Sequence, residues 1–313
     1  MPGTGSHALP AGPRAPNVSA GQTGQQTDRD VAGNAPLKGK TYLLGVGAQK
    51  AGTTWLYEYL WDHPQVAMSP VKEMHFWGYR DCDPWKWPVT HFRRKLRRRQ
   101  ELDAKAGVER DYAPLRERIR MAGDLALYRR FFRRQIRDGH TVFGEITPAY
   151  CHLPPEEFAF INRQFAHVKV IYLLRNPADR HWSQMRFSEG AEAVEELEAA
   201  IDRTLASPKY AERNNYDQTL ANLARAFRPD QIHIDFYETL FTPQAVTRLC
   251  TFLGIADRPA DFTRTANVSV KMPLAPAHRA TIVRALRDQY VAVDDHFNGQ
   301  IPQSWHDDMQ AWL

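Results

Sequence analysis

Cysteine, long apolar runs and clusters of metal ligands are all scarce in this sequence. Its 313 residues include three cysteines, Cys82, Cys151 and Cys250, which are odd in number and far apart along the chain. This spacing argues against a disulfide framework and a zinc site, so we expect no metal and a reducing cytoplasm. We find no apolar run of about 18 residues and no charged segment followed by an apolar stretch, so we expect neither a membrane span nor a secretory signal.

The first residues differ in composition from the rest of the chain. Residues 1–37 are rich in Gly, Pro, Ala, Ser, Thr and Gln and show no hydrophobic periodicity. Such a segment cannot bury enough apolar surface to offset its ordering entropy, so we expect a disordered N-terminal tail. Residues 38–313 are expected to form the globular domain. The formal net charge of +5 favours anionic ligands.

Strand-like and helical patterns alternate along the domain. Strands are expected over residues 42–46, 141–146, 168–174 and 231–237, with a short one over 66–68. Helices are expected over residues 55–60, 154–166, 193–206, 217–227, 243–253 and 276–297, with another after Pro177. This alternation is typical of a parallel sheet with helices on both faces. It predicts an α/β, P-loop-like three-layer fold with a central parallel sheet flanked by helices.

A strongly basic segment interrupts this alternation at residues 79–138. From Arg93 to Arg134 the chain has 15 Lys and Arg against six Asp and Glu. One interpretation is a solvated helical insertion. The other is a basic rim that contacts an anionic acceptor, another polyanion or, peripherally, a membrane surface. Because no recognised nucleic-acid motif accompanies the charge, we expect no specific nucleic-acid partner.

The stretch from Thr41 to Leu60 combines a strand, a small-residue loop and the start of a helix. From Gly47 the loop is G-x-x-x-x-G-T-T, close to the nucleotide P-loop pattern G-x-x-x-x-G-K-[ST]. Its lysine, Lys50, lies inside the loop, and Thr53 occupies the usual lysine position. Free backbone N–H groups, the helix dipole and the Lys50 ammonium together predict an anion site.

A second anion site is predicted after the strand that ends at Leu174. Arg175 suits a bidentate grip on phosphate, and Ser183 follows two helical turns later. Two such sites at one sheet edge indicate a nucleoside with phosphates at both ends, whereas a triphosphate needs one site. A Mg²⁺-dependent P-loop nucleotide kinase normally has lysine where Thr53 stands and an acidic residue at the second strand end, where this chain has Arg175. Glu145 is the only acidic residue well placed for Mg²⁺. A metal-free transfer with Lys50 neutralising the leaving group therefore fits better, and the kinase stays as the alternative.

Four segments resemble the sulfotransferases that use 3′-phosphoadenosine 5′-phosphosulfate (PAPS), in particular bacterial-type domains and the heparan sulfate and carbohydrate branch. They are Gly47-Ala-Gln-Lys50-Ala-Gly52-Thr53-Thr54, Lys72-Glu73-Met-His75-Phe76-Trp77, Gly144-Glu145-Ile-Thr147-Pro148-Ala-Tyr150 and Leu174-Arg175-Asn-Pro177-Ala-Asp-Arg180-His-Trp-Ser183. The second and third are similar to the K-E-x-H-F-F and E-K-[ST]-P-x-Y segments of that branch. The segments occur in the family's order from about Lys38 to Phe297.

The resemblance implies a sulfotransferase that moves a sulfuryl group from PAPS to a hydroxyl or amine and releases 3′-phosphoadenosine 5′-phosphate (PAP). Lys50 would stabilise the leaving group and Glu73 would be the general base, although Glu73 could instead form a structural ion pair with Lys72 or an arginine. The implied cofactor contacts are Gly47, Ala48, Gln49, Lys50, Ala51, Gly52, Thr53, Thr54, Arg175 and Ser183, with Tyr216 and Lys271 in less well matched segments. The implied substrate contacts are His75, Glu145 and Tyr150.

The resemblance favours a carbohydrate acceptor, with a lipid or a small natural product as alternatives. Ile146 stands where the branch often has lysine, which argues against glycosaminoglycan-like recognition. Lys271-Met-Pro also lacks the Lys-Gly pair that is common in the family's late cofactor loop.

Overall fold

The computed structural model describes residues 37–78, 89–189, 194–263 and 272–313. They belong to the unit Pro36–Leu313, which we describe by itself. The tail predicted for residues 1–37 lies outside the described residues except for Leu37. Lys271 also lies outside them, as do residues 79–88 of the predicted basic insertion.

The core of the unit is a five-stranded sheet. The strands are β1 (Thr41–Gly47), β2 (Val66–Met68), β3 (Val142–Ile146), β4 (His167–Leu174) and β5 (Ile232–Phe236). They lie in the order β2-β3-β1-β4-β5, and every neighbouring pair is parallel. Such strands are buried on both faces, which explains the near-continuous apolar runs of β1 and β4.

Helices connect the strands. They are α2 (Thr53–Trp61), α3 (Val89–Ala106), α4 (Ala113–Met121), α5 (Leu125–Gln135), α6 (Pro155–Gln164), α7 (Pro177–Ser188), α8 (Val194–Ala199), α9 (Ile201–Leu205), α10 (Pro208–Asn214), α11 (Tyr216–Ala226), α12 (Tyr237–Leu240), α13 (Pro243–Leu253), α14 (Pro276–Ala285), α15 (Arg287–His296) and α16 (Gln303–Trp312), together with the short 3₁₀ helices η2 (Pro148–His152) and η3 (Pro229–Gln231).

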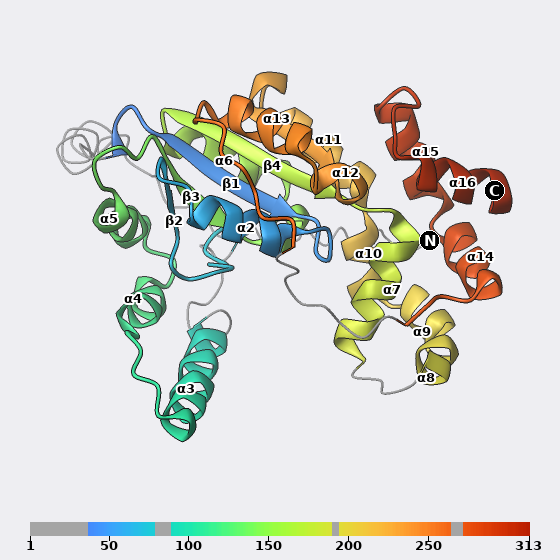
Figure 1. The fold of residues 1–313 in the computed structure, drawn as a ribbon, viewed down its shortest axis with the longest axis horizontal. Helices are drawn as coiled ribbons and strands as arrows, with labels where there is room; N and C mark the ends of the chain where they lie inside the picture. Colours follow the sequence, from blue (N-terminus) through green and yellow to red (C-terminus); the bar gives the residue numbers. More distant parts are fainter. Residues whose placement is uncertain (1–36, 79–88, 190–193, 264–271) are drawn as a thin grey trace, which may run out of the picture. The chain divides into compact units, whose positions relative to one another are not determined.

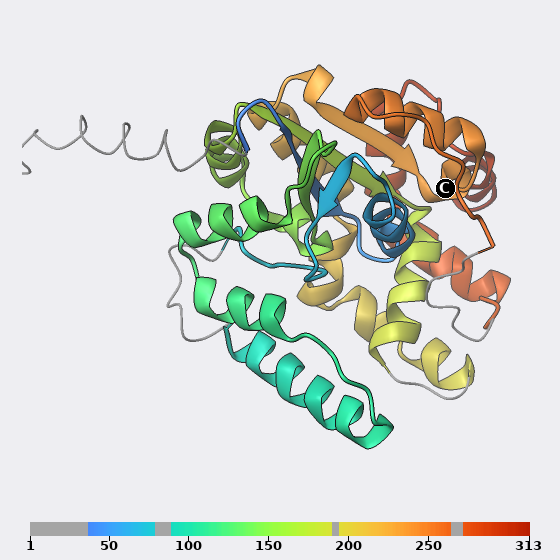
Figure 2. The ribbon, with the colours of Figure 1, turned by 60° about the vertical axis from the view of Figure 1, so that its left-hand side comes forward.

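These helices cover both faces of the sheet (Figures 1 and 2). On one face, Tyr42 of β1 packs edge-on against Phe132 of α5, with 6.4 Å between ring centroids. On the other face, His233 of β5 lies 5.1 Å from Phe252 of α13. The predicted α/β three-layer fold is therefore confirmed.

Two of the predicted helices are each divided in two. The helix expected over residues 193–206 is α8 and α9, which meet at Ala200, where the Ala200 N–H bonds back three residues to Leu197. The helix expected over 276–297 is α14 and α15, which meet at Leu286. The hydrophobic pattern alone does not reveal such a break. Helices α10, α12 and α16 were not predicted.

The basic segment connects β2 to β3 through α3, α4 and α5. Figures 1 and 2 show α3 and α4 side by side, away from the sheet. Most of the arginines of α3 are exposed, whereas Arg118 of α4 is completely buried. In the described parts of the chain, no helix combines the length and the apolar character that crossing a membrane requires.

Candidate functional site

The loop between β1 and α2 is shaped by two glycines in backbone conformations that other residues rarely adopt. Gly47 has φ 137° and Gly52 has φ 89°. A side chain on Gly52 would be strained by this conformation, and its Cβ atom, 2.8 Å from Leu240 Cδ2, would also displace that leucine side chain. Helix α2 begins at Thr53, and its first backbone N–H groups have no acceptor within the helix. The loop therefore offers N–H groups to an anion.

Lys50 is the centre of a group of cations at this edge of the sheet. Its carbonyl oxygen accepts a hydrogen bond from Arg175 Nη1 at 3.0 Å, and its Nζ lies 4.5 Å from the centroid of the Phe187 ring. Burial lowers the pKa of Lys50, and the positive charges of Arg175, Arg186 and Lys72 lower it further. Repelling cations held together in this way are stabilised when an anion binds among them.

Arg175 follows β4 and is held from two directions. Its guanidinium lies 4.3 Å from the centroid of the Tyr237 ring, and its carbonyl oxygen accepts a hydrogen bond from the Tyr216 hydroxyl at 2.8 Å. Tyr216 is buried, and because its hydrogen bond goes to the carbonyl oxygen of Arg175, it positions the backbone of that residue. Ser183 lies in the following helix, α7, and is nearly buried. The contact between Arg175 and Lys50 brings the two predicted anion sites together.

The loop after β2 has an unusual backbone. Five residues other than glycine have positive φ in the described ranges, and three of them are predicted site residues. Glu73 at 58° and His75 at 46° lie in this loop, and Lys50 at 71° lies in the loop after β1. Each such conformation costs on the order of 1–3 kcal/mol and persists when its surroundings hold it. Here Arg118 of α4 donates to the carbonyl oxygens of Met74, at 2.5 Å, and His75, at 2.8 Å. Sequence reasoning missed Arg118.

Glu73 is placed to be ionised. Its Oε2 lies 3.6 Å from His75 Nε2, and its side chain is 38% exposed. Burial alone would raise the pKa of Glu73, but hydrogen bonding to His75 and the charges of Lys72 and Lys95 outweigh it and lower the pKa. A carboxylate that is ionised and partly accessible can accept a proton.

Lys72 and Lys95 join this loop to its neighbours, and neither was predicted as a site residue. Lys72 Nζ donates to Thr54 Oγ1 at 2.5 Å, which links the loop of residues 69–78, called the base loop because it carries the predicted base Glu73, to the start of α2. Lys95 Nζ, on α3, donates to the Lys72 carbonyl oxygen at 3.4 Å. The signal for Lys72 was its place beside Glu73. The signal for Lys95 was hidden among the exposed arginines of the basic segment.

Glu145 lies inside the protein rather than at a surface. Its carboxylate accepts hydrogen bonds from Tyr128 at 2.7 Å, Thr147 at 2.7 Å and Tyr150 at 3.1 Å, and it has no exposed surface. Burial raises its pKa. The Tyr150 hydroxyl also accepts a hydrogen bond from the Phe76 N–H at 2.7 Å. The geometry of Glu145 is that of a support for the base loop, not of a contact with substrate.

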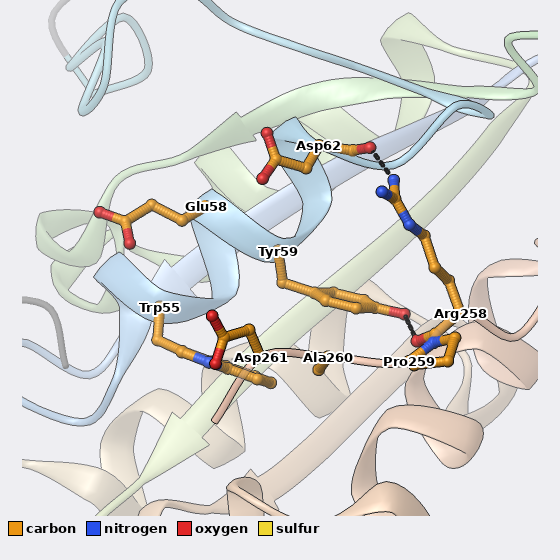
Figure 3. A pocket seen from close by; sticks show the side chains of 8 residues that line it. All are labelled: Trp55, Glu58, Tyr59, Asp62, Arg258, Pro259, Ala260 and Asp261. Atoms are coloured by element: carbon orange, nitrogen blue, oxygen red, sulfur yellow. Dashed lines mark hydrogen bonds between the residues drawn. The ribbon is translucent and has the colours of Figure 1, made fainter. Parts of the chain in front are cut away.

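A pocket of about 170 Å³ lies beside α2 and the segment 258–261 (Figure 3). Its lining includes Trp55, Tyr59 and four charged residues, the acidic Glu58, Asp62 and Asp261 and the basic Arg258. Because acidic residues outnumber the one arginine, the pocket does not suit the phosphates of the predicted donor. In the described ranges, no three His, Cys, Asp or Glu side chains gather as a metal site requires.

A larger cavity, of about 460 Å³, opens beside His75. Trp77 and Tyr150 line it together with residues of η2, α6 and α10. It therefore adjoins the side of the loop that holds the predicted general base. Of the predicted substrate contacts, His75 and Tyr150 line this cavity, and Glu145 does not.

The sheet is parallel, and its central strand β1 leads through the glycine loop into helix α2. The family model for the sulfotransferase domain matches residues 40–311, and the chain belongs to this family. Membership of this family decides between the sulfotransferase and the nucleotide kinase, which the residues alone left open, in favour of the sulfotransferase.

Two individual proteins are similar to parts of this chain. A membrane-associated sulfotransferase, kil1, of Dictyostelium discoideum is 26% identical over 160 residues, or 49% of this chain and 25% of its own length. The match thus spans about a quarter of that relative. The crystal structure of a sulfotransferase from Alicyclobacillus acidocaldarius has a TM-score of 0.58 and 20% identity, and the comparison covers 84% of this chain and 98% of that chain. This similarity supports the fold.

Proposed function

We propose that the protein transfers a sulfuryl group from PAPS to a hydroxyl or amine of an acceptor, and that this acceptor is a carbohydrate. The observation that carries the proposal is the contact of Arg175 with the Lys50 carbonyl, 3.0 Å long, beside a loop that carries an ionised Glu73. Cations for a donor phosphorylated at both ends and a base for the acceptor thus meet at one sheet edge.

The donor would be held by the backbone of residues 47–54 and by side chains of both anion sites. Thr53 and Thr54 begin α2, where backbone N–H groups and the positive end of the helix dipole favour the 5′-phosphosulfate. Arg175 and Ser183 would hold the 3′-phosphate. Arg186, whose charge acts on Lys50, is an additional cation for the donor. Lys271 stays a predicted contact.

PAPS, when bound, supplies the sulfuryl group and leaves as PAP. Glu73 accepts the proton of the acceptor hydroxyl while the oxygen of that hydroxyl bonds to sulfur. Lys50 balances the negative charge that collects on the phosphosulfate bridging oxygen as its bond to sulfur breaks. His75 orients the Glu73 carboxylate from 3.6 Å away. No step in this scheme uses a metal.

The location of the reaction is part of the proposal. The scattered cysteines favour the cytoplasm, and a lipid or small natural product remains the alternative acceptor. The printed name of the Dictyostelium relative describes a membrane-associated enzyme. The exposed arginines of α3 would suit a peripheral contact of this chain with an anionic membrane or another polyanion.

Binding of PAP tests the proposal directly. PAP should raise the melting temperature of the full chain, whereas ATP with Mg²⁺ should not, because ATP has no phosphate for the second anion site. Lys50→Ala should lose most of this stabilisation and turnover, and Lys40→Ala, at the opposite end of β1, should keep both. Stabilisation by ATP with Mg²⁺ but not by PAP would favour the kinase.

A further inference from the structure

Asn176 joins the two predicted contacts for the 3′-phosphate of the donor. It follows Arg175 directly, and its side chain caps α7, the helix that carries Ser183, by accepting a hydrogen bond from the Asp179 N–H at 3.2 Å. Its backbone N–H donates to Glu238 Oε1 of α12 at 2.7 Å. Asn176 has no exposed surface, so its polar groups depend on partners inside the protein. These partners therefore set the course of the backbone between Arg175 and α7.

The partners of the Asn176 side-chain amide come from the end of the chain, where helices α14, α15 and α16 lie together (Figure 1). Asp308 of α16 is buried, and its Oδ2 accepts a hydrogen bond from Asn176 Nδ2 at 2.7 Å. The same Nδ2 group donates to the Ser304 carbonyl oxygen at 3.3 Å. The hydroxyl of Tyr290, on α15, lies 2.8 Å from Asp308 Oδ2 and 2.9 Å from Asn176 Oδ1 and can donate to either. A residue that follows Asn176 by 132 positions thus holds its amide.

Arg279 of α14 holds the Asp308 carboxylate in place. Its Nε and Nη2 donate to Asp308 Oδ1 and Oδ2 at 2.6 and 2.8 Å, and its Nη1 donates to Asp179 Oδ1, in the first turn of α7, at 2.7 Å. Two hydrogen bonds from one guanidinium fix the orientation of a carboxylate, and the positive charge offsets the cost of burying it. One oxygen of Asp308 is therefore directed at Asn176, and α14 and α16 are tied to the start of α7.

We propose that Asp308 is a positioning residue for the 3′-phosphate of the donor. This inference rests on the proposed function, in which Arg175 and Ser183 hold that phosphate. Asp308 does not touch the donor. It fixes Asn176, and Asn176 fixes both the backbone that carries Arg175 and the start of the helix that carries Ser183. The end of the chain thereby selects a nucleotide with a 3′-phosphate over one that has only a 5′-phosphate.

The test compares PAP with adenosine 5′-monophosphate (AMP), which lacks the 3′-phosphate. PAP is titrated into the full chain by calorimetry, AMP is measured as its competitor, and the ratio of the Kd of AMP to the Kd of PAP gives the preference for the 3′-phosphate. We expect Asp308→Ala to lower this ratio about five- to 20-fold through weaker binding of PAP, because the two hydrogen bonds from an arginine to a phosphate depend on its exact placement. The Kd of AMP should change by less than about twofold.

Matched variants separate position from charge and from stability. Asp308→Asn removes the negative charge but keeps an oxygen for Asn176 Nδ2, so it should recover most of the ratio. Tyr290→Phe removes one hydroxyl and keeps the ring, and it should lower the ratio about two- to threefold. Asp307→Ala is the control, because Asp307 is the exposed neighbour of Asp308 on α16, and it should leave the ratio unchanged.

Three results would overturn the inference. The first is an unchanged ratio in Asp308→Ala or, if that variant does not fold, in Tyr290→Phe. The second is equal weakening of PAP and AMP, which would mean that Asp308 only stabilises the fold. The third is tighter binding of PAP in both Asp308→Ala and Asp308→Asn, which would mean that the carboxylate acts by repelling the phosphate.

The unaltered chain separates this inference from the proposed function. If PAP binds it more tightly than AMP and Asp308→Ala keeps the same ratio, the role of Asp308 fails and the sulfotransferase proposal stands. If PAP does not bind the unaltered chain, or binds no more tightly than AMP, the proposed function fails and the role of Asp308 fails with it.

Discussion

Arg118 holds the base loop in its strained conformation, so replacing it should slow the reaction without weakening donor binding. The completely buried guanidinium donates to the carbonyl oxygens of Met74, His75 and Ala122 at 2.5, 2.8 and 3.3 Å. In Arg118→Met these carbonyls lose their charged donor. Because a hydrogen bond to a charged group contributes about 1.5–3 kcal/mol and burying the charge offsets part of this, we expect the free energy of unfolding to fall by about 2–4 kcal/mol.

The effect on turnover follows from the backbone. Glu73 at φ 58° and His75 at φ 46° relax once their clamp is lost, and release of about 1–3 kcal/mol of strain corresponds to an about 5- to 150-fold smaller population of the working loop. We therefore expect kcat to fall by about this factor. PAP affinity should change by less than about threefold, because Lys50 and Arg175 are not partners of Arg118.

The assays are urea unfolding, calorimetric titration with PAP, and PAP release from PAPS with a methyl glycoside as acceptor. Arg116→Met is the matched control, because Arg116 lies on the same helix with its side chain exposed, and it should resemble the unaltered chain. Arg118→Lys keeps the charge but cannot bind two carbonyls with one planar group, so it should recover only part of kcat. Unchanged kcat in a folded Arg118→Met protein would refute this reasoning, and so would equal losses of kcat and PAP affinity.

Glu73→Gln should keep PAP binding and lose turnover, and intact turnover would show that Glu73 is not the base. The lowered pKa of Glu73 keeps it ionised at neutral pH, so protonation of Glu73 should reduce activity at acidic pH. Lys95→Met removes one cause of that lowering and should move this acidic limb of the pH–rate profile to higher pH. Lys105→Met, at the far end of α3, should leave the profile in place, and a profile that Lys95→Met does not move would rule out this coupling. If α3 contacts anionic membranes, more protein should sediment with phosphatidylglycerol vesicles than with phosphatidylcholine vesicles. This binding should weaken in salt and in a variant with Arg97→Glu and Arg98→Glu. Equal sedimentation with both kinds of vesicle would exclude this contact.

Local sequence was sufficient for the elements whose signals lie within a few residues. The strand β1, the glycine loop and the start of α2 follow directly from their residue types, and α13 ends at Gly254, which has the positive φ of 67° that stops a helix. The parallel sheet also followed, because alternating strands and helices bury both faces of each strand. The place of Lys50 inside the loop favoured a metal-free transfer over a kinase, and the family match decided between the two.

Contacts between distant residues were decided by the tertiary structure. Arg118 lies 43 residues from His75, and Lys95 lies 23 residues from Lys72, so no periodicity connects either pair. The sequence placed both cations in one basic segment, where an exposed arginine and a buried one look alike. Packing separates them, because a guanidinium becomes a clamp only when the fold removes water and presents carbonyl oxygens to it.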